Sequence, residues 1–160
     1  MLVAYDDRLT EHLAGVHHPE HPDRVRVVAR ELQWRGMFDE RIDTAVARPD
    51  ELACVHTPRY IALVERECLW LDSDGATLLS TGDTAIDAGS YDAAARAAGG
   101  TLAALDRVCA ERRAAFALVR PPRAPRGAGA RHGLLHLQQR GARGNHVQLE
   151  DRRKGAGRRY

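Results

Sequence analysis

The chain has 160 residues, of which 44% are hydrophobic and 29% are charged, a composition typical of a globular protein with one sizeable core. No apolar run is long enough to cross a bilayer, and acidic residues follow the first five residues before a secretory signal can develop. We therefore expect a cytoplasmic protein without a membrane segment.

The net charge of +2 hides two opposed parts of the chain. Residues 1–120 carry a net charge of −6, whereas residues 121–160 carry +8. The apolar periodicity also stops near Arg120, where arginine, glycine and alanine begin to dominate. The sequence therefore predicts a folded region over residues 1–122 and a disordered, arginine- and glycine-rich tail over residues 123–160.

The first half of the chain predicts a strand, a helix and a second strand. Residues 2–5 are apolar and end at an acidic turn, as expected for a short strand. From Asp23 the apolar residues recur at helical spacing, and Gly36 suits the left-handed position that ends a helix. Residues 42–47 predict the second strand.

Two further helices are marked by their first residues. Thr57 and Pro58 provide an N-cap and a proline at the first helical position, and the buried stripe that follows comprises Tyr60, Ile61, Val64 and Cys68. Ser90 is predicted to cap a long alanine-rich helix. Within that helix, Gly99-Gly100 would let a neighbouring segment pack closely.

The last predicted element is the fully apolar run at residues 115–119. Such a strand is typical of a parallel sheet with helices on both faces, and the alternation of strands and helices favours the same α/β architecture. Binding sites of these sheets lie beyond the carboxyl ends of the strands. We therefore expect functional residues just after Tyr5 and just after Val119.

Histidine and cysteine are the obvious metal-binding types in this chain. Residues 17–24 read HHPEHPDR, but Pro19 and Pro22 would hold this segment extended, so a structural loop is favoured over a metal site. His56 is interpreted as a hydrogen-bonded structural histidine rather than a catalyst. The widely separated cysteines predict reduced structural thiols: Cys54, Cys68 and Cys109.

Four stretches together resemble the histone deacetylase family, which includes bacterial acetylpolyamine amidohydrolases. In chain order they are HHPEHPDRVRVVARELQ, RPDELACVHTPRYIALVE, SYDAAARAAGGTLAALDRV and AFALVRPP. Their order and approximate spacing match the family over nearly all of residues 1–120. The resemblance implies the N-terminal part of an arginase- and deacetylase-like fold, a mostly parallel sheet in three layers.

The resemblance also implies a zinc-dependent amidohydrolase acting on acetyl-lysine peptides or small acetylated amines. Family members hold Zn²⁺ with two aspartates and a histidine, and a tandem histidine pair that follows an arginine and two prolines activates water. Here the corresponding positions are occupied by Arg123, Ala124 and Pro125. We therefore expect no intact catalytic pair, no metal ligands and no bound zinc ion in this chain.

The genetic code offers an explanation for the missing pair. If each codon from Arg123 on is read one nucleotide later, residues 123–127 permit G-H-H-A-E and residues 132–140 permit M-G-F-C-T-F-N-N-V. These are the family's next two motifs, and residues 154–160 permit R-A-R-V-V-D-T, which resembles the strand that leads into its metal ligands. We interpret residues 123–160 as an out-of-frame tail, with a one-base insertion in the preceding proline codons as the simplest cause.

The resemblance assigns several earlier residues to the substrate pocket. Asp83 resembles the family's rim aspartate, which bonds the substrate backbone, although an aspartate that caps a turn is an equal alternative. The family's first-loop pattern is matched by residues that would shape the pocket wall: His18, Pro19, Glu20 and Arg24.

Two functions remain at this stage. The first is a member of the deacetylase family that is inactive as written, because the residues resembling the metal ligands lie out of frame or beyond Tyr160. The alternative is an acidic α/β binding module whose basic tail is a genuine arm for nucleic acid or an acidic partner. An out-of-frame tail would bind phosphates only non-specifically, through its charge.

Overall fold

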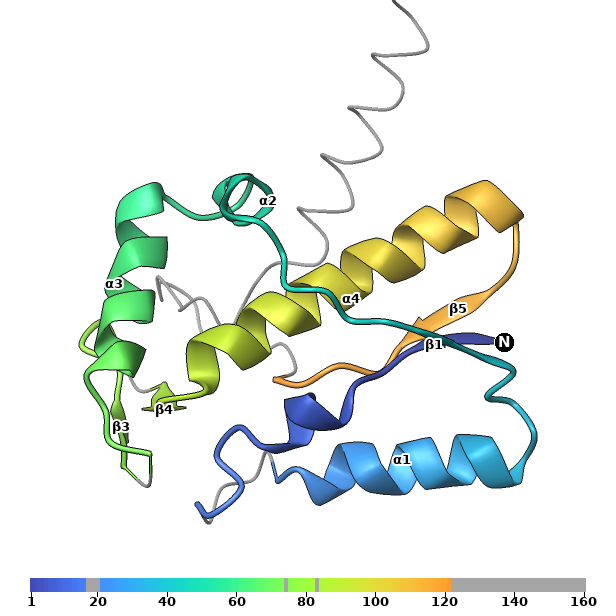
Figure 1. Ribbon diagram of the computed structural model, residues 1–160, viewed down its shortest axis with the longest axis horizontal. Helices are drawn as coiled ribbons and strands as arrows, with labels where there is room; N and C mark the ends of the chain where they lie inside the picture. The colour runs from blue at the N-terminus through green and yellow to red at the C-terminus, as the bar shows by residue number, and fades with distance from the viewer. Residues whose placement is uncertain (17–20, 74, 83, 122–160) are drawn as a thin grey trace, which may run out of the picture.

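The computed structural model describes residues 1–16, 21–73, 75–82 and 84–121 (Figure 1). These residues form, in chain order, the elements β1 (Leu2–Ala4), η1 (Asp7–Thr10), α1 (Asp23–Trp34), β2 (Glu40–Ile42), α2 (Pro49–Ala53), α3 (Pro58–Leu69), β3 (Ala76–Leu78), β4 (Ala85–Asp87), α4 (Ser90–Glu111) and β5 (Ala115–Ala117).

The central sheet is parallel and contains β1 in its middle. Its strand order is β2-β1-β5, and Leu2 of β1 is in register with Glu40 on one side and with Ala115 on the other. Helices α1 and α4 lie on opposite sides of β1 and β5 (Figure 1). The predicted mostly parallel α/β fold with three layers is therefore confirmed. A separate antiparallel pair joins β3 to β4.

Successive side chains of β1 point alternately to the two faces of the sheet, and each face is covered by a helix. Val3 and Tyr5 pack in one cluster with Val25 and Ala29 of α1, whereas Leu2 and Ala4 pack in another with Ile42 and Ala104 on the α4 side. Leu2, Val3 and Ala4 are completely buried. Because successive side chains of a strand point to opposite faces, a strand covered on both faces has to be apolar throughout.

A third cluster joins the remaining helices to the β3–β4 hairpin. Its buried residues are Ala47, Leu52, Ile61, Val64, Cys68, Leu79, Ile86, Ala94, Ala95 and Ala98. The predicted start of α3 is confirmed, since the Thr57 side chain accepts a hydrogen bond from the Tyr60 backbone N–H and Pro58 occupies the first turn. Gly36 follows α1 at φ 63°, as predicted.

Three predictions of element limits need correction. The second strand is at Glu40–Ile42 rather than at residues 42–47, because Ala47 turns to α4 and donates its backbone N–H to the Ala95 carbonyl at 3.0 Å. Ser90 is not the cap of α4: Gly89 precedes the helix, and the Ser90 hydroxyl has other partners. The last strand ends at Ala117 instead of at residue 119. None of the described helices is long and apolar enough to cross a membrane.

Candidate functional site

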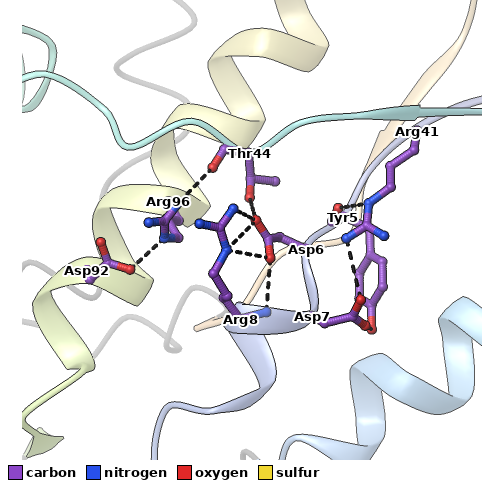
Figure 2. A network of polar contacts seen from close by, with 8 residues as sticks. All are labelled: Tyr5, Asp6, Asp7, Arg8, Arg41, Thr44, Asp92 and Arg96. Atoms are coloured by element: carbon purple, nitrogen blue, oxygen red, sulfur yellow. Dashed lines mark hydrogen bonds and ion pairs between the residues drawn. The ribbon is translucent and has the colours of Figure 1, made fainter.

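The carboxyl end of β1 leads directly into a buried carboxylate, that of Asp6. Arg8 donates to both of its oxygens, at 3.0 Å from Nε and 2.5 Å from Nη2, and the Thr44 hydroxyl donates at 3.0 Å (Figure 2). The hydrogen bonds from Arg8 hold the pKa of Asp6 well below its usual range, although burial opposes them. Asp6 therefore stays ionised and joins the loop after β1 to the segment after β2.

Arg41 makes a second connection at the same edge. Its Nε donates to the Tyr5 carbonyl at 2.8 Å, its guanidinium lies 5.3 Å from the centre of the Tyr5 ring, and it pairs with Asp7 at 3.5 Å (Figure 2). The Tyr5 hydroxyl donates to Asp7 at 2.8 Å. Burial, followed by this hydrogen bond, raises the pKa of Tyr5 to about 12. The phenol therefore remains protonated at neutral pH.

Arg96 extends the network from α4. Its Nε bonds to Asp92 at 2.5 Å, one turn earlier, and its Nη1 bonds to the Thr44 carbonyl at 3.4 Å (Figure 2). Each arginine drawn in Figure 2 is thus engaged by an acidic side chain or a backbone carbonyl of the same domain. These cations hold the edge of the sheet together, and their charge is already compensated.

A buried cluster next to this edge contains a serine, a histidine and an aspartate. The Ser90 hydroxyl donates to Asp87 Oδ1 at 2.8 Å and lies 2.9 Å from His12 Nδ1, which is 3.5 Å from the same Asp87 oxygen. Ser90 is completely buried, and His12 is 4% exposed. Because serine has a single hydroxyl hydrogen and gives it to Asp87, His12 Nδ1 must carry the hydrogen of the His12–Ser90 bond.

This geometry does not form a nucleophilic triad. In a triad the serine and the aspartate bind opposite nitrogens of the imidazole, so that the ring can take a proton from one side while it is held from the other. Here Ser90 and Asp87 both lie at Nδ1, and the serine oxygen has no access to solvent. The arrangement can fix backbone segments, but it cannot deliver a proton to a substrate.

Arg120 lies at the carboxyl end of the last strand, where the sequence predicts functional residues. It is 1% exposed, and its Nη1 donates to the backbone carbonyl of His12. The chain after β5 is therefore tied to the loop after β1. Asp6 likewise occupies the predicted position just after Tyr5.

Most of the residues that the sequence assigned to the site lie outside the described part of the chain: His18, Pro19, Glu20, Asp83, Arg123, Ala124 and Pro125. Arg24 is described, and it is an exposed residue in the first turn of α1. His21 Nδ1 accepts a hydrogen bond from the Asp23 backbone N–H at 3.3 Å, as expected for a loop that leads into a helix. No group of three potential metal ligands occurs among the residues that the structure describes.

His56 packs against Tyr60, with 5.6 Å between the ring centroids. This ring contact just before α3 fits a structural role for His56, and its predicted hydrogen bond stays a prediction. The sequence had not pointed to a cluster of His12, Asp87 and Ser90, since Ser90 was predicted only as a helix cap. Their one detectable signal is polarity at the ends of apolar segments, and the side-chain partners of His12 among the described residues, Asp87 and Ser90, lie more than 70 residues away.

The three-layered fold and the polar carboxyl edge of its sheet define an α/β domain of the kind that builds sites at that edge. The family description "Histone deacetylase domain" matches residues 18–124. The chain therefore belongs to the histone deacetylase family, as the sequence resemblance implies.

Individual relatives give the same result. The chain is 35% identical to Histone deacetylase 15 of Arabidopsis thaliana over 142 residues, which cover 82% of this chain and 24% of that protein. It is 36% identical to Histone deacetylase 8 of Arabidopsis thaliana over 110 residues, covering 66% of this chain and 28% of the relative. The chain thus spans about a quarter of the length of these curated relatives.

A solved structure supports the fold as well. The crystal structure of the HDA15 HD domain superposes with a TM-score of 0.75 at 29% sequence identity, over 92% of this chain and 43% of that chain. The described sheet and helices therefore correspond to less than half of that solved chain.

Proposed function

We propose that the chain carries the first part of a zinc-dependent deacetylase domain whose substrates are acetyl-lysine peptides or small acetylated amines such as acetylpolyamines. The observation that carries this proposal is the histone deacetylase match over residues 18–124. The relatives named as histone deacetylases support hydrolysis of an acetyl amide as the reaction class.

The described residues contribute a scaffold to such a site. A parallel sheet collects its functional groups at the carboxyl ends of its strands, and that edge is held here by Asp6 after β1 and by Arg120 after β5. Both side chains are almost completely buried and bonded within the domain. They can therefore shape the base of a pocket without taking part in the reaction.

The residues that the structure describes do not fit a zinc ion. The described ranges contain no convergent group of three histidine, cysteine, aspartate or glutamate side chains. The family's proton-transferring pair is replaced by Arg123, Ala124 and Pro125, none of which binds zinc or exchanges a proton at neutral pH. We propose that the chain as written holds no zinc and does not hydrolyse acetyl amides, so no catalytic step is assigned to it.

A shift of reading frame after Pro122 accounts for this disagreement. The shifted reading of residues 123–127 and 132–140 supplies the family's next two motifs, including the tandem histidines. The family match ends at residue 124, directly after the proposed point of the shift. The same shift explains the basic tail, since arginine and glycine codons result from misreading a G+C-rich sequence. A genuine nucleic-acid arm is therefore the less favoured function.

The test is to delete one base within the codons for Pro121 and Pro122 and to let translation continue to its next stop. The product should contain about one zinc ion per chain by metal analysis and should hydrolyse acetyl-lysine and acetylpolyamine amides. The matched control deletes a whole proline codon, which leaves the frame unchanged and should give a product with neither property. A one-base deletion product that reaches full domain length without zinc or activity would refute the proposal.

A further inference from the structure

Three segments that are distant in sequence meet at the buried His12–Asp87–Ser90 cluster. His12 belongs to the loop after β1, and Arg120 reaches the cluster from the end of β5. Asp87 ends β4 and Ser90 begins α4, so the two residues flank the β4–α4 turn. Each segment contributes a group that completes the hydrogen bonds of another. We call these four residues the cross-loop cluster.

The connections between the first two segments are direct. Asp87 Oδ2 accepts the backbone N–H of Leu13 at 2.5 Å, and Asp87 Oδ1 lies 3.5 Å from His12 Nδ1. The Ser90 hydroxyl accepts the backbone N–H of Asp87 at 2.7 Å and binds the His12 ring at 2.9 Å. The loop after β1 is therefore held by both side chains of the β4–α4 turn.

The third segment is attached through the backbone of the first. Arg120 donates to the His12 carbonyl, and Leu118 donates its backbone N–H to the Ala4 carbonyl at 2.9 Å. The guanidinium of Arg120 is among the most completely buried side chains of the described chain. A shift of the loop after β1 would leave this cation with a broken bond in a site that water does not reach, which is costly.

These segments border the stretches that the resemblance assigns to the substrate pocket. In sequence, Leu13–Val16 precedes the HHPEHPDR stretch, β4 follows Asp83, and Arg120 precedes the position of the tandem histidines. We infer that Asp87 and Ser90 are positioning residues, which fix the loop after β1 and, through it, the chain after β5 relative to the β3–β4 hairpin. This inference rests on the proposed function for its biological meaning, but its geometry does not depend on zinc or on activity.

Hydrogen exchange of the 160-residue chain tests the inference. Ser90→Ala removes the hydroxyl that binds His12 and Asp87. We expect exchange to become about tenfold faster in the segments before residue 17 and around Leu118–Arg120, and not only in the β4–α4 turn, because losing a buried hydrogen bond of about 1.4 kcal/mol corresponds to that factor. Faster exchange confined to residues 87–90 would overturn the inference.

The matched control is Thr101→Val, which removes another buried hydroxyl of the same helix, bonded to the Ala97 carbonyl at 2.8 Å. This variant should lose similar stability without faster exchange in the loop after β1. Equal acceleration of all three segments in both variants would mean that the cross-loop cluster stabilises the fold without coupling the segments.

The tautomer of His12 gives an independent signature. With selective ¹⁵N-histidine labelling, Nδ1 of His12 should carry a hydrogen in the wild-type chain, and His12→Gln identifies its signal. In Asp87→Asn the amide can donate as well as accept, so the protonation pattern of the His12 ring should change together with the exchange of the loop. An unprotonated Nδ1 in the wild-type chain would refute the bonding scheme. Failure of these experiments leaves zinc binding by the restored reading frame unaffected, so the two proposals can fail separately.

Discussion

Gly99 of α4 lies so close to the backbone of Ala45 that a Cβ added to it would stand 1.9 Å from the Ala45 carbonyl oxygen. The same Cβ would stand 2.9 Å from the backbone nitrogen of Ala47. Both are backbone atoms, which cannot move away as a flexible side chain can. The glycine therefore allows the segment after β2 to cross the helix in contact with it.

Replacing this glycine should be strongly destabilising. We expect Gly99→Ala to lower the free energy of unfolding by at least about 2 kcal/mol, because the segment after β2 must separate from α4 to admit the methyl group. Urea denaturation followed by circular dichroism measures the loss. Gly15→Ala is the control, since among the described residues no atom outside its two chain neighbours lies within 4 Å of the added Cβ. An equal loss of stability there would contradict the explanation.

The three cysteines should react at very different rates. Cys68 is 1% exposed within the third core cluster, and burial raises the pKa of its thiol to about 11. Because the thiolate is the reactive species, Cys68 should resist alkylation at pH 8, whereas the exposed Cys54 and Cys109 should be modified. Mass spectrometry should find two modified thiols in the folded chain and three in urea. Rapid modification of Cys68 without denaturant would show that this core cluster opens readily.

Acid should weaken the cross-loop cluster. Burial raises the pKa of Asp87, but hydrogen bonds from His12, Leu13 and Ser90 outweigh burial and leave the pKa well below its usual range. A carboxyl group whose pKa is depressed in the folded state stabilises the protein at pH values above its unfolded-state pKa of about 3.9. This stabilisation is lost as the pH falls below that value. Asp87→Asn should therefore be less stable than the wild type at pH 7 and should lose less stability between pH 5 and pH 3.

Urea titrations at several pH values provide this measurement. Asp72→Asn serves as the control, because the Asp72 side chain is exposed on the loop before β3. This control should follow the wild-type pH dependence. Parallel pH curves for the wild type and Asp87→Asn would show that the carboxylate of Asp87 contributes nothing through its charge.

Tryptophan fluorescence should be a poor reporter of unfolding for this protein. The chain contains two tryptophans, Trp34 at the end of α1 and Trp70 after α3, and they are 81% and 83% exposed. Unfolding changes the surroundings of such side chains little. We expect the emission maximum to move by only a few nanometres through a transition that circular dichroism records fully. A large blue shift on folding would place one of the two rings in an interface.

The sequence predicted those elements whose signals are local. Thr57 and Pro58 mark the start of α3, and the apolar residues 2–5 mark the strand β1. Residues 42–47 were predicted as the second strand, but the strand ends at Ile42, and Ala47 bonds to Ala95 of α4, about fifty residues later. The hairpin of β3 and β4 was not predicted, because β3 is exposed and each strand has three residues.

In the candidate site, too, the sequence predicted features with local signals and missed contacts between distant residues. Asp6 and Arg120 follow the first and last predicted strands, where the alternation of strands and helices predicts functional residues. Both are buried and bonded within the domain, and a functional site at this edge stays a prediction. His12 and Asp87 are joined across 74 intervening positions, and nothing local to either residue indicates that they meet. A single sequence cannot reveal such a pair, because its stabilisation arises only after the sheet has brought the loops together.

The position of β1 between β2 and β5 also sets an order of events during synthesis. Leu2, Val3 and Ala4 are synthesised more than 100 residues before Ala115–Ala117, which is one of their two neighbouring strands. At about 5–20 residues per second, roughly 5–20 s pass before that strand has been synthesised. Throughout that interval the most apolar strand of the domain has one edge open and an incomplete cover. Strand β1 is therefore enclosed late although it precedes both of its neighbours in the chain, and until then it is an apolar segment that a chaperone can bind on the nascent polypeptide.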